Sequence, residues 1–97
     1  MLNSKQRAYL KSVASKLDPA FQVGKGGVSP EQVEGISQYL KAHEIVKIKV
    51  LENSLYTASE AAQEIAELTN SEIVIVIGSK AVLFKRNPEK PKISQNI

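Results

Sequence analysis

The residues best suited to chemistry in this chain are four consecutive ones, Gly24-Lys25-Gly26-Gly27. Backbone N–H groups in a glycine turn that precedes a helix can bind an anion, and the helix dipole reinforces them. Lys25 adds a mobile positive charge. A sugar-phosphate backbone could also approach closely, because glycine has no Cβ. The stretch therefore indicates a phosphate-binding turn, although a turn that merely needs positive φ angles would use the same glycines.

Two predicted elements hold this turn in place. Residues 20–23 form a short apolar run that predicts a strand, and residues 30–42 predict a helix. Ser29 suits the N-cap of that helix, Pro30 its first position, and Gln32 can close a capping box. The turn is thus expected at a strand-to-helix junction, directly before a helix N-terminus.

The remaining elements follow from periodicity and caps. Residues 4–17 predict a first helix with apolar positions at helical spacing, and 57–69 predict a third helix that opens with a Thr57–Glu60 capping box. Residues 45–51 alternate as a strand with a packed face and a face of lysines. The β-branched run 73–77 predicts a central strand buried on both sides, and Gly78-Ser79 predicts a hairpin to the last strand, 81–84.

The order α-β-α-β-α-β-β predicts a fold of the α/β (α+β) type. We expect a single compact layered domain over residues 1–86, with a four-stranded mixed sheet packed with helices. Residues 87–97 form a basic tail with two prolines and little to bury, and we expect this tail to be extended or disordered.

Charge is unevenly distributed along the chain. Residues 50–79 contain five acidic residues and no Lys or Arg, so the rest carries all 13 basic residues against five acidic ones, a net charge of +8. Such segregation favours a basic surface that attracts polyanions through phosphate contacts. A well-solvated surface of mixed charge would have the same composition.

Several function classes find no support in the sequence. There is no cysteine, and His43 has no histidine or cysteine partner, so we expect no metal or other cofactor and no catalysis. His43 follows a predicted helix end, where a structural role is expected. Gly24-Lys25 is not followed by Ser or Thr, which argues against a nucleotide-hydrolysing loop. Without a signal-type or membrane-spanning run, we expect a soluble, cytoplasmic monomer with no membrane partner and no small-molecule substrate.

Four groups of residues, taken in order, resemble those of the CRM domain. This domain is the RNA-binding module of chloroplast RNA splicing and ribosome maturation proteins. The resemblance is in particular to its bacterial stand-alone YhbY-like members. The four groups are Lys5-Gln6-Arg7 with Leu10; Gln22-Val23-Gly24-Lys25 with Gly27; residues 44–49; and Val76-Ile77-Gly78 with residues 81–84. The resemblance covers about residues 3 to 95. It implies a fold similar to the C-terminal domain of translation initiation factor 3.

The resemblance also implies a function and a site. Its bacterial members are associated with precursors of the large (50S) ribosomal subunit, so ribosomal RNA is the expected partner and ribosome assembly the expected role. The family's G-x-x-G loop maps onto Gly24, Lys25, Gly26 and Gly27, and basic first-helix residues share its role. The RNA-binding residues expected here are that loop with Lys5, Arg7 and Lys11, widened by Lys47, Lys49, Lys80 and Arg86, and by Lys85.

Two alternatives stay open at this stage. Lys47 and Lys49 would also solvate an exposed sheet face without binding anything. The acidic third helix, with Glu60, Glu64 and Glu67, would suit docking of an assembly factor, which makes a protein-interaction module the second hypothesis. Because the chain offers few exposed aromatic residues, an RNA partner is expected to be structured and recognised by shape and phosphates.

Overall fold

A four-stranded mixed sheet, with strands in the order β1-β2-β4-β3, organises the molecule. The structure is a computed structural model, and it describes residues 2–94. The elements are α1 (Ser4–Ala14), β1 (Phe21–Val23), α2 (Pro30–His43), β2 (Ile45–Val50), α3 (Ala58–Thr69), β3 (Glu72–Ile77) and β4 (Lys80–Phe84). β1 and β2 are parallel, whereas β4 runs antiparallel to both of its neighbours. The predicted order of elements and the predicted fold class are confirmed.

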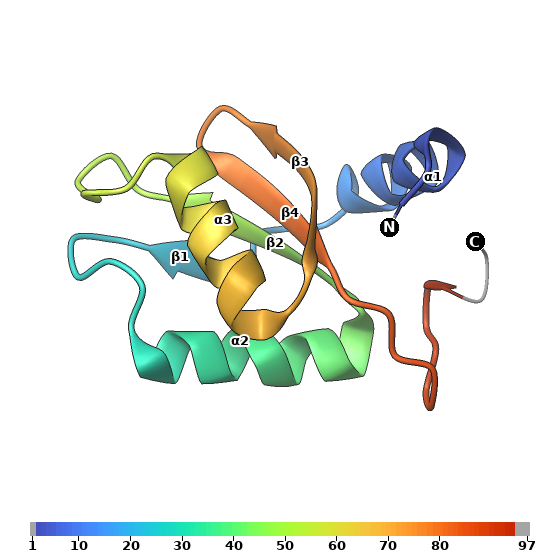
Figure 1. Ribbon diagram of the computed structural model, residues 1–97. Coiled ribbons are helices and arrows are strands. Elements are labelled where there is room, and N and C mark those ends of the chain that lie inside the picture. Colours follow the sequence, from blue (N-terminus) through green and yellow to red (C-terminus); the bar gives the residue numbers. More distant parts are fainter. Residues whose placement is uncertain (1, 95–97) are drawn as a thin grey trace.

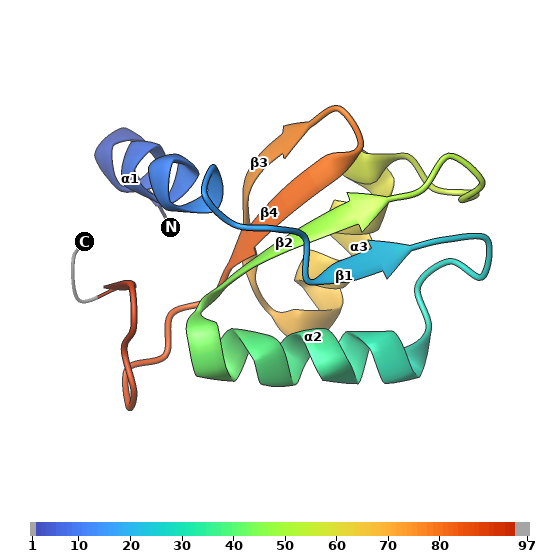
Figure 2. The ribbon, with the colours of Figure 1, turned by 180° about the vertical axis from the view of Figure 1, so that it is seen from behind.

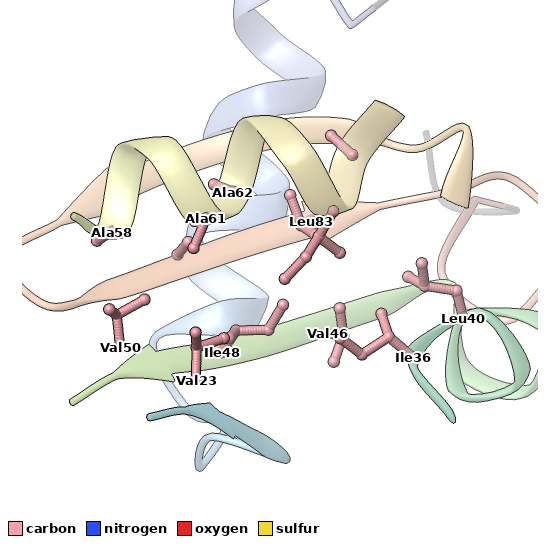
Figure 3. Close-up of a cluster of buried hydrophobic side chains, with 13 residues drawn as sticks. Val23, Ile36, Leu40, Val46, Ile48, Val50, Ala58, Ala61, Ala62 and Leu83 are labelled. Atoms are coloured by element: carbon pink, nitrogen blue, oxygen red, sulfur yellow. The ribbon is translucent and has the colours of Figure 1, made fainter. Parts of the chain in front are cut away.

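The main core lies between one face of the sheet and helices α2 and α3 (Figure 1). Figure 3 shows Ala58, Ala61 and Ala62 of α3 directed at the sheet, opposite Ile48 and Leu83. These small side chains let the helix approach the strands closely, and Ile48 and Leu83 are almost completely buried. The alternation predicted for β2 is therefore confirmed, with Val46, Ile48 and Val50 on this face.

Helix α1 packs on the other face of the sheet. Leu10 and Ala14 are buried against Val82, Phe84 and a residue of β3 in a second, smaller cluster. Figure 2 shows that α1 lies toward β3 and leaves the ends of β1 and β2 uncovered by any helix. The helix ends at Ala14, three residues before the predicted end, because the chain tightens into i→i−3 turns at residues 16 and 17. One face of the sheet is thus only partly covered.

Strand β3 corrects one prediction, because it is an edge strand and not a central one. The hairpin at Gly78, whose φ is +57°, returns β4 into the position between β3 and β2. The β-branched run was misread because α3 and α1 cover β3 from opposite faces, which gives an edge strand apolar residues on both sides. Its end is open, and Ile77 is 65% exposed.

Residues 85–93 have neither helix nor strand, but they are not detached from the domain, contrary to the expectation that the tail would bury little. Glu44, at the end of α2, is completely buried and accepts hydrogen bonds from this segment. Its Oε1 accepts from the N–H groups of Lys92, Ile93 and Ser94 at 2.6, 2.7 and 2.9 Å. Its Oε2 accepts from the Asn87 N–H at 2.6 Å and from the Ser94 hydroxyl at 2.7 Å. Residues 95–97 of the predicted tail lie outside the described residues.

We call this arrangement the Glu44 clasp: one carboxylate that binds residues 87–94. Burial by itself would raise the pKa of the Glu44 carboxyl, but hydrogen bonds from Asn87, Ser94 and Lys92 outweigh burial and lower the pKa to about 2. The residue also adopts a left-handed backbone conformation, with φ of +67°, which closes α2. Glu44 therefore ends α2 through its backbone and fixes the last described segment of the chain through its ionised side chain.

Candidate nucleic-acid interface

The glycine turn is closed by one hydrogen bond, in which the Gly27 N–H donates to the Gly24 carbonyl at 3.0 Å. Lys25 and Gly26 occupy the two central positions and are exposed. Within residues 2–94, neither of their N–H groups donates to an acceptor of the chain. The turn therefore presents two unsatisfied donors beside a lysine, a combination that suits a phosphate oxygen.

Two glycines of the turn have different requirements. Gly27 has a φ of +71°, and a Cβ at this position would lie 2.9 Å from Cε2 of Tyr56. A Cβ at Gly26 would meet nothing within 4 Å. Gly27 is thus required by the fold itself, whereas the space above Gly26 is open to a ligand. Tyr56 also links the turn to α3, because its phenol is hydrogen-bonded to Glu64 of that helix. This hydrogen bond and the charge of Glu64 raise the pKa of the phenol.

The N-terminus of α2 offers fewer free donors than the sequence indicates. Ser29 is the N-cap as predicted, and its side chain accepts from the Gln32 N–H at 3.1 Å. The predicted capping box does not form, because the Gln32 side chain donates to the Gln22 carbonyl of β1 instead. Pro30 has no N–H, and Glu31 places a negative charge in the first turn. The turn, more than the helix end, supplies the donors.

Beside the turn, the uncovered part of the sheet carries lysines. The strand register places Gln22 next to Lys49, and Lys49 directly opposite Lys80, so these three residues cross the sheet in one row. Lys47 and Lys11 of α1 continue this surface, since a groove of about 410 Å³ is lined by Lys11, Lys47 and Lys80 over apolar residues such as Ile75. We call the four residues Lys11, Lys47, Lys49 and Lys80 the lysine face.

Not all the predicted basic residues are free to bind. The Arg7 guanidinium donates to the carbonyls of Ile73 and Val74, both at 2.7 Å, where β3 is irregular. The Lys47 ammonium donates to the Ala14 and Leu17 carbonyls at 3.2 and 3.0 Å, and so caps the end of α1. Both side chains stabilise the fold. Sequence patterns missed these roles because the carbonyl acceptors are 30 to 67 residues away.

Two further residues lie away from the turn. Lys5 is exposed in the first turn of α1. Arg86 follows Phe84, which pairs with Ile45 at the opposite end of β2 from Val50, the partner of Val23. The distance along the strand is about 16 Å, taken as five residues at roughly 3.3 Å each. Lys85, beside Arg86, donates to the Thr69 carbonyl at 2.9 Å and so closes α3. The structure groups the turn with Lys49 and Lys80 and separates Arg86 from them.

The acidic third helix also has internal roles. Glu60 forms the predicted capping box, and its hydrogen bonds with Thr57 hold the pKa of its carboxyl below the usual value. Glu64 is half-buried beside Tyr56, whereas Glu67 is exposed, as is its neighbour Leu68 at 59%. Two of the three predicted docking carboxylates therefore contribute to the fold.

Residues 2–94 provide neither a metal-binding cluster nor a membrane-spanning helix. No three or more His, Asp or Glu side chains in this range gather as a metal ion would require. None of the helices in the same range is long and apolar enough to cross a membrane. The turn and the lysine face are the basic arrangement that suits phosphate groups.

The fold and the site together define the protein as a small α+β domain with a glycine turn beside a basic sheet face. The family model described as the CRS1 / YhbY (CRM) domain matches residues 2–85, and the chain belongs to this family. The predicted family is therefore confirmed.

Individual relatives agree with this assignment. The chain is 38% identical to the protein named Probable RNA-binding protein YqeI of Bacillus subtilis, over 96% of this chain and 97% of that one. It is 30% identical to a protein named RNA-binding protein of Haemophilus influenzae, over 91% and 89% of the two chains. Among solved structures, the hypothetical protein SAV1595 of Staphylococcus aureus superposes with a TM-score of 0.77 at 40% identity, over 93% of this chain and 94% of that one.

Proposed function

We propose that this protein binds RNA, and that the glycine turn together with the lysine face holds the RNA phosphates. The names of the relatives from Bacillus subtilis and Haemophilus influenzae support RNA as the partner. We propose that the protein acts by binding alone, without catalysing a reaction and without a cofactor.

The observation that carries the proposal is the Lys49–Lys80 pair. Like charges directly opposite each other on neighbouring strands repel and destabilise a sheet. A bound polyanion converts that repulsion into attraction, because each ammonium then has a phosphate near it. Lys25, in the turn that follows β1, and Lys11, across the groove, extend the positive surface on either side. We therefore assign phosphate contacts to Lys11, Lys25, Lys49 and Lys80, and a supporting charge to Lys47.

The RNA that suits this surface is structured. No aromatic residue lines the groove or belongs to the row formed by Gln22, Lys49 and Lys80, so bases have no stacking platform there. Recognition of shape and phosphates is typical of proteins that bind folded RNA. The family resemblance supports the finer proposal that this RNA is ribosomal, in precursors of the large subunit, and that the protein assists assembly in the cytoplasm.

The test uses fluorescence anisotropy with a hairpin RNA at increasing salt. Wild-type affinity should fall steeply with salt, because phosphate contacts release counterions. Lys25→Glu should weaken binding by about tenfold or more and leave the melting temperature unchanged, since the Lys25 side chain is exposed. Lys16→Glu, which makes the same change in charge at an exposed residue outside the turn and the lysine face, is the control. Unchanged affinity in a folded Lys25→Glu protein would remove the turn from the interface.

Cell extracts test the finer proposal. Sedimentation through a sucrose gradient should place the protein with free or precursor large subunits at low salt and release it at high salt. Migration only at the top of the gradient, at low salt as well, would contradict a role on ribosomal precursors.

A protein-docking role is the second candidate, and the exposed Leu68 beside Glu67 favours it. Glu67→Lys with Leu68→Ser should abolish capture of an assembly factor if docking is the main function. Lys25→Glu should leave that capture intact. The opposite pattern, loss of ribosomal association with Lys25→Glu alone, supports RNA binding.

A further inference from the structure

A second basic cleft lies at the opposite end of α2 from the glycine turn. Its volume is about 560 Å³, within the range of small-molecule sites. Three parts of the chain form its walls: the end of α1 with Val13 and Leu17, the last turn of α2, and the segment held by the Glu44 clasp. Leu17, Ile45 and Ile93 form an aliphatic floor, and Ile45 is buried.

Aromatic rings lead into this cleft. Phe21 and Tyr39 meet edge to face, with ring centroids 5.7 Å apart. Tyr39 in turn lies against His43, with centroids 4.3 Å apart and an angle of 41° between the ring planes. His43 is exposed and lines the cleft, and the Tyr39 ring supports it from one side. A planar group could pack against His43 at low entropic cost, because this ring is already supported.

The rim of the cleft is positively charged. Lys41 and Lys90 are exposed and line the cleft from α2 and from the clasped segment, and none of its lining residues is acidic. The nearby Glu44 carboxylate is buried and directed into its five hydrogen bonds, so it presents no oxygen to the cleft surface. An aliphatic floor, an exposed ring and a cationic rim together match a nucleobase with its phosphate.

We propose that this cleft binds one unpaired nucleotide that flanks the structured RNA on the lysine face. The base lies over the aliphatic floor against His43, and the phosphate contacts Lys41 and Lys90. This inference rests on the proposed function. The 14 residues of α2 separate the cleft from the glycine turn by about 21 Å at 1.5 Å per residue, a span that a single RNA with a helical part and a short overhang can cover.

The first test detects the nucleotide directly. Adenosine 5′-monophosphate is titrated into labelled protein, and NMR shifts are followed at Ala42 and Ile93 in the cleft and at Gly26 in the turn. Shifts in the cleft that His43→Ala removes support the proposal. Equal shifts with inorganic phosphate would show that the rim binds anions without recognising a base, and shifts confined to Gly26 would place the nucleotide at the turn. Either result overturns the proposal.

The second test separates this inference from RNA binding as such. A blunt hairpin RNA and the same hairpin with a five-nucleotide overhang are compared by anisotropy. The overhang should strengthen wild-type binding by about fivefold or more, because stacking of one base on an aromatic residue is worth at least that. Lys90→Glu and His43→Ala should each remove this gain and leave blunt-hairpin binding within about twofold. Lys25→Glu, which changes net charge as Lys90→Glu does, should weaken both RNAs equally.

Two outcomes would count against different parts. If the wild type binds both RNAs equally and Lys25→Glu weakens both, the cleft proposal is wrong and the proposed function stands. If neither RNA binds, the proposed function fails, and the NMR titration alone decides whether the cleft takes a nucleotide.

Discussion

The two ends of α2 differ in whether their polar groups form hydrogen bonds within the described residues. At the N-terminal end, the N–H groups of Lys25 and Gly26 have no acceptor within residues 2–94, and Lys25 is exposed. At the C-terminal end, the Glu44 carboxylate accepts five hydrogen bonds and is completely buried. A polar group that is satisfied within the fold contributes to stability, whereas one left unsatisfied at the surface is available to a ligand. Substitutions at the two ends should therefore affect different measurements.

The largest loss of stability is expected for Glu44→Gln. The amide keeps the volume, but its NH₂ group faces N–H donors and the charge that strengthens these hydrogen bonds is lost. A pKa lowered from 4.5 to about 2 corresponds to about 3 kcal/mol of unfolding free energy. Urea denaturation measures the change, and Glu89→Gln, on the exposed part of the same segment, is the control. A loss below about 1 kcal/mol would show that the clasp is not a major source of stability.

Acid should weaken the same end of the molecule. Because the pKa of Glu44 is lower in the folded chain than the unperturbed 4.5, its contribution is complete above pH 4.5. It is lost progressively as the pH falls from 4.5 toward 2. Stability of the wild type should therefore drop more steeply over this window than that of Glu44→Gln, as measured by thermal melting at each pH. Parallel curves for the two proteins would contradict the assignment.

An intermediate loss is expected for Gly27→Ala, at the other end. The substitution combines a φ of +71° with a contact of 2.9 Å to Tyr56, and we expect a cost of about 2 kcal/mol. Gly26→Ala, one residue away in open space, should change stability by less than about 0.5 kcal/mol. If Gly26→Ala lowers RNA affinity without lowering stability, the RNA backbone approaches the turn closely. Equal stability of the two variants would remove the distinction between these glycines.

The smallest effects come from a matched pair on β2. Lys47→Met removes the two hydrogen bonds that cap α1 and should cost about 1 kcal/mol. Lys49→Met removes repulsion with Lys80, so stability should stay the same or rise slightly, while RNA affinity falls. Denaturation and anisotropy on the two variants separate the roles. Loss of stability in Lys49→Met with unchanged RNA binding would show that Lys49 stabilises the fold and does not bind RNA.

Local signals in the sequence predicted the elements well, and long-range partners explain what they missed. The Thr57–Glu60 capping box and the Gly78 hairpin depend on residues close in the chain, and both are present. The clasp depends on partners 43 to 50 residues from Glu44, and nothing in the local pattern distinguishes a buried glutamate at a helix end from a solvated one.

The candidate site shows the same limit. Alternation placed Lys47 and Lys49 on one face correctly, but it could not show that Lys47 reaches the carbonyls of α1. The position of β3 at the edge of the sheet was missed for a related reason. Apolar residues on both faces of a strand indicate that the strand is buried, but they do not indicate its place in the strand order. The pairing of Lys49 with Lys80 required the sheet register, which only the three-dimensional structure supplies.

The Glu44 clasp has a consequence for the time course of folding during synthesis. Ser94, which binds Glu44, is synthesised 50 residues after it, which at 5–20 residues per second is a delay of roughly 3 to 10 seconds. Until then α2 and the sheet can form only around an ionised carboxylate that lacks its partners. Until residues 87–94 are available, the rest of the fold lacks the stabilisation that the five hydrogen bonds to Glu44 supply, so we expect full stability only after they bind.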